Sequence, residues 1–129
     1  MISRRPSDPS PLSVLRDELH ALFADVPAFT ARRRDGVAVD VVDAGRSVEI
    51  RLDLLPLAPD DLVVEIDGDI LRLRGSRLIE ADESAADTRL HVKKRWHFLR
   101  GIQLPTELDP MSATTHYAHG QLTVTLRKR

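Results

Sequence analysis

Hydrophobic and polar residues alternate along most of the chain from Val37 onward. An alternation with a period of two is typical of a β-strand that buries one face and exposes the other. Turn signals, of which Asp67-Gly68-Asp69 and His119-Gly120 are the clearest, lie between the alternating segments. The alternating segments are 37–41, 48–54, 62–66, 70–74, 90–104 and 121–127, and a further strand is expected before His119. Many short strands separated by turns predict an all-β fold, an immunoglobulin-like antiparallel β-sandwich.

The pattern is different near the N-terminus, where hydrophobic residues from Leu12 to Val26 recur at spacings of three and four. This spacing predicts a short amphipathic helix that begins near Pro11, with Ser13 as its N-cap, and ends at Pro27. The preceding residues are rich in Pro, Ser and Arg and predict disorder, and residues 28–36 predict a linker. The predicted organisation is therefore an N-terminal arm over 1–36, a β-sandwich over 37–127 and a two-residue remainder, 128–129.

Two stretches inside the β region do not alternate. Residues 76–89, which carry acids, Ser and Ala, predict an exposed excursion from the sandwich. Residues 106–110 predict a short acidic link that contains Pro110.

Composition narrows the function classes. The chain has 129 residues, a net charge of −1 and no cysteine, which excludes disulfides and thiolate chemistry. No apolar run approaches the length of a membrane span, and the N-terminus does not resemble a secretory signal. We therefore expect a cytoplasmic protein that binds neither nucleic acid nor membrane. The Arg32-Arg33-Arg34 run is isolated and balanced by nearby acids, so a solvated linker is the better interpretation.

Catalytic and metal chemistry are not expected. His91 and His97 share one face of a predicted strand, but His116 and His119 point to opposite faces, and a zinc site needs three or four converging ligands. Adjacent carboxylates such as Asp60-Asp61 diverge or lie in solvent, and no nucleophile elbow or glycine-rich phosphate loop is present. The sequence predicts no enzyme activity, no metal site and no cofactor.

Arg100 is an unusual charged residue because it shares strand parity with Phe98, Ile102 and Leu104. Its charge should therefore point toward the buried face. One interpretation is a side chain whose stem packs while its guanidinium reaches water. The other is an Arg that is paired with another group, since a buried unpaired charge is strongly destabilising.

Several segments together resemble the small heat-shock protein (alpha-crystallin) family in its bacterial form. They are Asp53-Leu54-Leu55-Pro56 through Leu62, the strand with Leu71, Leu73 and Gly75, the Phe98/Arg100 pair, Leu104-Pro105, and "THYAHGQL" from Thr115 to Leu122. Thr115, His119 and Gln121 depart from the family signature, which has Ala, Asn and Val there. The alternation of apolar residues survives these departures.

The resemblance implies an ATP-independent chaperone, a holdase, that binds partly unfolded client proteins through exposed apolar surface. One implied client surface is the apolar face of the N-terminal helix, with Leu15, Leu19, Leu22 and Phe23. The other is a groove at the sandwich edge, lined by Leu62, Val64 and Ile66 on one strand and by Thr115 and Tyr117 on another. Alternatively, the helix packs on its own dimer. A CS-type co-chaperone domain that binds one folded partner is a second possible function.

The resemblance also implies a homodimer formed by strand exchange through the 76–89 excursion. The implied interface residues are Leu78, Ile79, Leu90, Phe98 and Arg100. Members of the family usually continue past the last strand with an I-x-I tripeptide that docks in a neighbour's groove, and no such tripeptide follows Leu126 in this sequence. We therefore expect a dimer or small oligomer whose groove is free for clients or for the N-terminal arm.

Overall fold

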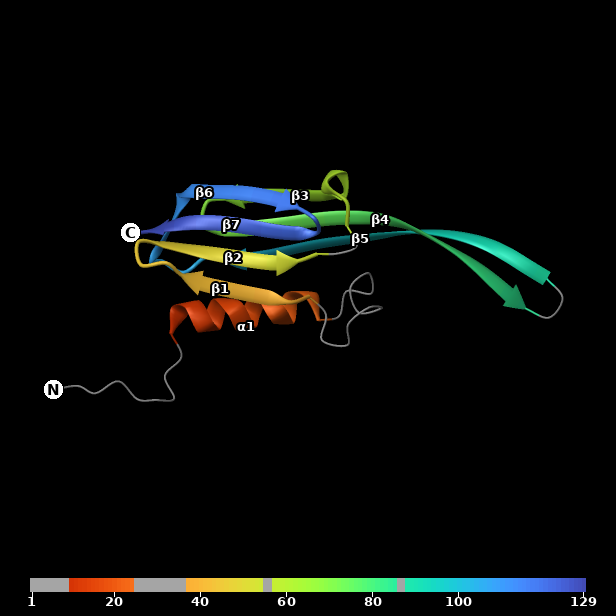
Figure 1. Cartoon of the computed structure of the whole chain (residues 1–129), viewed down its shortest axis with the longest axis horizontal. Coiled ribbons are helices and arrows are strands. Elements are labelled where there is room, and N and C mark those ends of the chain that lie inside the picture. The colour runs from red at the N-terminus through yellow and green to blue at the C-terminus, as the bar shows by residue number, and fades with distance from the viewer. Residues whose placement is uncertain (1–9, 25–36, 55–56, 86–87) are drawn as a thin grey trace.

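The computed structural model describes residues 10–24, 37–54, 57–85 and 88–129, apart from the side chains of 79, 81 and 83–85 (Figure 1). The predicted linker, Arg32-Arg33-Arg34 and Pro27 lie outside these residues. The described elements are α1 (Pro11–Phe23), β1 (Val39–Asp43), β2 (Ser47–Asp53), the 3-10 turn η1 (Pro59–Asp61), β3 (Leu62–Asp67), β4 (Ile70–Ala85), β5 (Thr88–Gln103), β6 (Leu108–Ala118) and β7 (Gln121–Lys128).

The strands form two antiparallel sheets that pack face to face, which confirms the predicted β-sandwich. One sheet has the order β1-β2-β7-β6 and the other has the order β3-β4-β5. The alternation seen in the sequence becomes a cross-strand ladder of buried side chains, in which Ile50 of β2 lies opposite Val124 of β7 and Leu52 lies opposite Leu122. Cross-strand pairs of side chains on one face stabilise the sheet.

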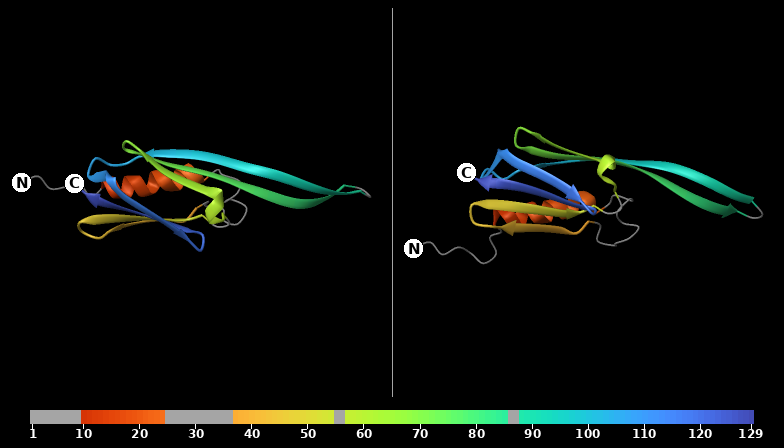
Figure 2. Two further views of the ribbon diagram at one scale, coloured as in Figure 1. Left: turned by 90° about the horizontal axis from the view of Figure 1, so that it is seen from above. Right: turned by 45° about the horizontal axis from the view of Figure 1, so that its top comes forward.

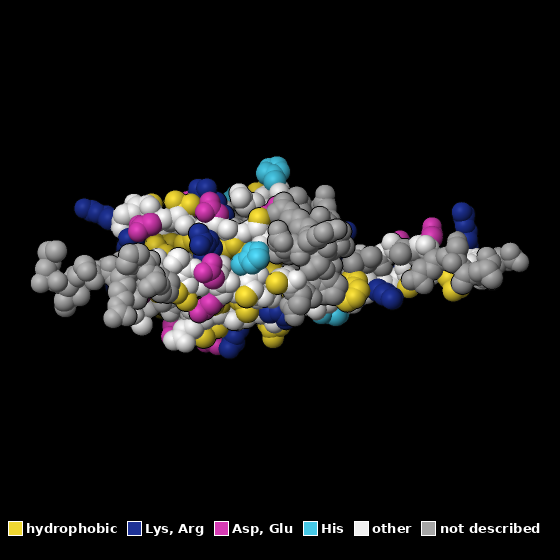
Figure 3. Space-filling model, turned by 90° about the horizontal axis from the view of Figure 1, so that it is seen from below, with side chains coloured by type: hydrophobic (Ala, Val, Ile, Leu, Met, Phe, Trp, Pro, Cys, Tyr) yellow, Lys and Arg dark blue, Asp and Glu magenta, His cyan; other side chains and the backbone are white. Residues whose placement is uncertain are grey.

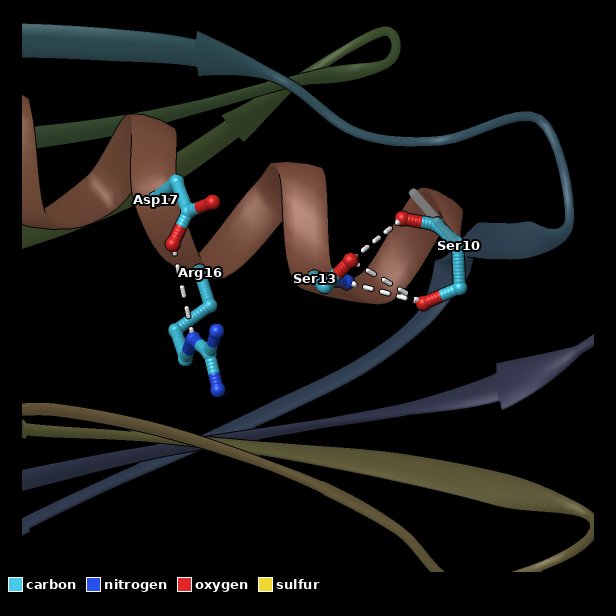
Figure 4. A network of polar contacts seen from close by, with 4 residues as sticks. All are labelled: Ser10, Ser13, Arg16 and Asp17. Carbon is cyan, nitrogen blue, oxygen red and sulfur yellow. Dashed lines mark hydrogen bonds and ion pairs between the residues drawn. The ribbon is translucent and has the colours of Figure 1, made fainter. Parts of the chain in front are cut away.

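The N-terminal helix begins as the spacing predicts, but its cap is a different serine. Ser10 is the N-cap, and its hydroxyl oxygen accepts a hydrogen bond from the Ser13 backbone N–H at 3.2 Å (Figure 4). Ser13, the predicted cap, already lies in the first turn, where its hydroxyl donates to the Ser10 carbonyl at 3.0 Å. The physical reason is Pro11, whose missing N–H and fixed φ suit the first helical position and so place the cap one residue before it.

Helix α1 fills one side of the sandwich. It lies alongside β1, an edge strand of the four-stranded sheet, and also contacts β5, an edge strand of the other sheet (Figures 1 and 2). Its apolar face joins the same core as the strands, with Leu15, Leu19 and Phe23 at most 1% exposed. The predicted N-terminal arm is therefore not a separate unit, because residues 10–24 are part of the sandwich core.

The described residues of the predicted exposed excursion over 76–89 belong to two paired strands. Strands β4 and β5 stay in register from Ile70↔Gln103 out to Ala85↔Thr88. β3 pairs with β4 only as far as Gly75, so beyond that residue the two long strands leave the sandwich together (Figure 2). We call the part that projects, residues 76–85 with 88–97, the arm.

Strand β6 begins at Leu108, inside the segment that was predicted to be a link. The prediction failed because Pro110, which disfavours regular pairing, sits in an irregularity where the register with β7 shifts between Asp109 and Thr114. There the Ser112 hydroxyl accepts a hydrogen bond from the Arg127 N–H at 2.8 Å in place of a backbone carbonyl. The last strand also runs past the predicted boundary, since β7 includes Lys128 and the Arg129 N–H donates to the Glu107 carbonyl.

Candidate functional site

The fold brings together the two walls of the predicted groove. Edge strands β3 and β6, from different sheets, lie next to each other. Leu62, Val64 and Ile66 share one face of β3, partly buried against the core, and Tyr117 on β6 is partly buried in the same way. Thr115 is more exposed than the other four. The predicted lining residues therefore converge on one edge of the sandwich, with apolar surface that remains partly open.

Tyr117 also anchors this edge. Its hydroxyl donates a hydrogen bond to the Leu57 carbonyl at 2.5 Å, which ties β6 to the segment before η1. Burial raises the pKa of the Tyr117 phenol above its ordinary value of 10.0, and the negative charges of Asp53 and Asp61 raise it further. The phenol thus stays neutral and keeps its donor proton over the physiological range.

At the base of the arm, three residues pack so closely that one of them must be glycine. Gly75 of β4 lies directly opposite Phe98 of β5, and a Cβ on Gly75 would come within 2.2 Å of the Phe98 ring. The same ring packs edge-on against Phe23 of α1, with centroids 5.8 Å apart and planes at 82°. Phe98 was predicted to lie in a dimer interface, but it is 6% exposed and belongs to the core of its own chain.

Arg100 is found at the C-terminal end of α1. Its Nε donates to the Leu22 carbonyl at 2.9 Å, and a terminal nitrogen, Nη1, donates to the Leu99 carbonyl at 3.0 Å. A cation that bonds the last carbonyls of a helix also interacts favourably with the helix dipole. The side chain does lean toward the core face, as its parity predicts, and in this chain its guanidinium caps the helix.

The helix residues predicted to bind clients are not on the surface of this structure. Leu15, Leu19 and Phe23 are buried, and Leu22 is partly buried against the core. The exposed side of α1 carries Arg16, Asp17 and Glu18 instead. Within one chain the apolar residues of α1 pack against the sandwich core, and the alternative in which the helix packs on its own dimer stays a prediction.

The arm, which includes most of the predicted dimer interface, carries exposed apolar side chains. Leu78 is 45% exposed and Leu90 is 52% exposed, while the Ile79 side chain lies outside the described ones. Trp96, 37% exposed, lies on the same face of β5 as Leu90 and was missed by the sequence prediction. Its parity with Leu90 in the alternating segment was the available signal. Figure 3 shows hydrophobic side chains interspersed with charged ones along the arm.

Charged residues on the other face of the arm pair across its two strands. His91 lies between two acids, with Nδ1 at 2.8 Å from Asp82 and Nε2 at 3.6 Å from Glu80, and Lys93 also approaches Glu80 at 3.5 Å. These groups are well exposed, so each pair contributes little to stability. Within the described residues, no group of three or more His, Asp or Glu side chains is arranged to hold a metal ion.

None of the helices in the described part of the chain has the length and apolarity that crossing a membrane requires.

Comparison with known proteins agrees with this geometry. Heat shock protein beta-9 of Mus musculus is 31% identical over 81% of this chain and 49% of its own length. Small heat shock protein C4 of Rickettsia felis is 25% identical over 70% of this chain and 55% of its own length. The chain thus spans about half the length of these curated relatives.

A solved small heat-shock protein from Xylella fastidiosa is 27% identical to this chain. Its TM-score is 0.52, and the match covers 72% of this chain and 85% of that one. The model of the Hsp20/alpha crystallin family matches residues 40–129, which include every strand of the sandwich except Val39 at the start of β1. The chain belongs to the Hsp20/alpha crystallin family.

Proposed function

We propose that this protein is an ATP-independent holdase that captures partly unfolded proteins and keeps them from aggregating. The observation that supports the proposal is the contact between edge strands β3 and β6, beside partly buried apolar side chains, where we propose that a client groove lies. An extended client segment can add to such an edge through main-chain hydrogen bonds while its alternate side chains enter apolar positions. Main-chain pairing does not depend on sequence, which suits a chaperone that meets many clients.

The energetics of this capture need no nucleotide. Burial of apolar surface contributes about 25 cal/mol per Å², so a few hundred square ångströms give weak and reversible binding. Family membership supports the same function, since the relatives named above are heat-shock proteins.

The protein acts, in this proposal, as a dimer joined by strand exchange through the arm. The arm's exposed Leu90 and Trp96 continue the alternation that Phe98 and Ile102 follow in the core, but they have no core to enter within their own chain. A second copy supplies the missing cover. The CS-type adaptor function is less well supported, because the helix α1 and the long arm are features that such domains generally lack.

The test is suppression of thermal aggregation. Substoichiometric protein is mixed with two unrelated thermolabile clients without ATP, and light scattering is followed on heating. A variant with Val64→Thr and Ile66→Thr makes the groove polar with little change of shape and should lose most of the suppression. Val63→Thr is the matched control, since Val63 is on the same strand but is exposed on its other face.

The holdase proposal is wrong if the parent protein leaves the scattering of both clients unchanged. The groove assignment alone is wrong if the double variant is folded by circular dichroism and suppresses aggregation as well as the Val63→Thr control.

A further inference from the structure

Helix α1 covers one of the two sides of the sandwich where the sheets end in edge strands, the side opposite β3 and β6. That side is bounded by β1, which pairs only with β2, and by β5, which pairs only with β4. The helix lies between them and buries Leu15, Leu19 and Phe23 there (Figures 1 and 2). An edge strand with free N–H and C=O groups is a template on which another strand can pair. Helix α1 therefore lies in the way of any further strand that would pair with the free edge of β1.

The cover over β5 is incomplete. The contacts of α1 fall at Phe98 and Arg100, close to the point where β5 enters the sandwich. Residues 88–97 of β5 lie beyond these contacts, in the arm. On this side of the molecule, the helix thus divides the free strand edges into a covered part at the sandwich and an uncovered part on the arm.

The charges of the two free edges are complementary. The five residues of β1, Val39–Asp43, include two Asp and no cation. The arm part of β5 includes no acid and has four cations, Arg89, Lys93, Lys94 and Arg95. Two copies of β5 would bring like charges together, which is unfavourable across a strand pair, whereas β5 beside β1 brings opposite charges together. At about 3.3 Å per residue the arm reaches roughly 30 Å beyond the sandwich, enough to meet a second molecule.

The helical structure of α1 depends on its docking. A helix of this length, 13 residues, is marginal in water by itself and depends on packing to remain helical. Its outward face is polar, and the contacts of its C-terminal end with the sandwich include the Phe23–Phe98 aromatic pair and the Arg100 hydrogen bond. Loss of docking and loss of helical structure should therefore occur together.

We infer that α1 is an intramolecular guard of the β1 edge, and that it competes with the arm of a second copy for that edge. The inference rests on the proposed dimer. The docked helix keeps β1 closed, and the arm of the partner pairs with β1 when the helix leaves. In a symmetric exchange each protomer must release its own helix, so the two equilibria are linked.

The experiment changes helix stability at positions that do not touch the sandwich. Ala21 and Asp17 are both exposed on α1. Ala21→Gly weakens the helix by a factor of about five in its equilibrium, and Asp17→Ala strengthens it by a smaller factor in the opposite direction. Hydrogen exchange of residues 10–24 measures release of the helix, and native mass spectrometry over a dilution series measures the dimer dissociation constant.

If α1 guards β1, Ala21→Gly exchanges about fivefold faster in α1 and dimerises up to about 25-fold more tightly, because both protomers pay for release. Asp17→Ala should do the reverse. Linkage also requires that α1 of the parent protein exchange faster in the dimer than in the diluted monomer. The guard is disproved if α1 exchange accelerates while the dissociation constant stays constant, or if α1 is equally protected in monomer and dimer.

These outcomes are separate from those of the holdase test. A parent protein that fails to suppress aggregation but shows the linked changes in exchange and dimerisation would end the holdase proposal and leave the guard intact. A protein that suppresses aggregation without the linkage would do the opposite.

Discussion

Replacement of Gly75 by alanine should destabilise the protein through a single methyl group. The added Cβ would lie 2.2 Å from Cε1 and 2.5 Å from Cζ of Phe98, far inside van der Waals contact. The ring cannot simply move away, because its other side packs edge-on against Phe23. The methyl group therefore displaces either the ring or the strand, and with it the end of α1.

The magnitude follows from two opposing effects. Overpacking of a core costs about 1–3 kcal/mol, and disturbance of an edge-to-face aromatic pair costs about 0.5–1.5 kcal/mol more. Replacing glycine gains about 0.5–1 kcal/mol by restricting the unfolded chain. The balance is a loss of about 2 kcal/mol, which for a domain of this size lowers the melting temperature by roughly 6–12 °C.

Gly101 provides a matched control in the same hairpin. A Cβ there would approach Ile70 Cγ2 at 3.4 Å and Arg72 Cγ at 3.7 Å, which is ordinary contact. Gly101→Ala should therefore melt at the parent temperature or slightly above it. Differential scanning calorimetry of the two variants decides the matter. If the Gly75→Ala variant has the same melting temperature as the Gly101→Ala variant, the close packing of Gly75 on Phe98 is not present in solution.

Three further predictions concern other parts of the molecule. Tyr117 is the sole tyrosine, so ultraviolet titration measures its ionisation directly, and its pKa should exceed 10.0 in the folded protein. The free energy of unfolding should then fall as the pH rises above 10, because the phenol of the unfolded chain loses its proton first. A folded titration midpoint at or below that of the denatured chain would contradict the burial of the phenol. Ser10→Ala should lower the stability of α1 by about 1 kcal/mol and Ser13→Ala should not, as measured by hydrogen exchange; equal effects would refute Ser10 as the cap. Trp96, the sole tryptophan, should shift its fluorescence to longer wavelength on dilution through the dimer dissociation constant, and an unchanged spectrum would remove the arm from the interface.

The sandwich was predictable because its signal is local. In β2 and β7 the apolar residues that alternate in the sequence are the buried ones in the structure, and the positive φ of Gly68 and Gly120 falls at the turns that were expected. The start of α1 was also predictable, apart from its cap, which depended on the preference of Pro11 for the first helical position.

The sequence could not predict which group a residue contacts when several groups in the fold could serve. The position of a side chain on one face of a strand or helix does not identify the group that it meets there. The parity of Arg100 correctly indicates a charge on the core face, but no sequence rule says that a helix some 80 residues earlier supplies the carbonyl it bonds. In the same way, the spacing of Leu15, Leu19 and Phe23 predicts an apolar helix face without saying what covers it.

The alternation along β5 shows this limit within one strand and bears on the proposed dimer. Leu90, Val92, Trp96, Phe98 and Ile102 share a face and are equivalent by pattern, yet Phe98 and Ile102 are buried and the first three are not. The division falls where β3 stops pairing with β4, at Gly75, beyond which the hairpin projects from the sandwich (Figure 2). Apolar residues beyond that point gain nothing within the monomer, since burial is what makes an apolar face favourable. Their alternation is what the proposed strand-exchanged dimer would explain, since the partner's sheet would cover this face.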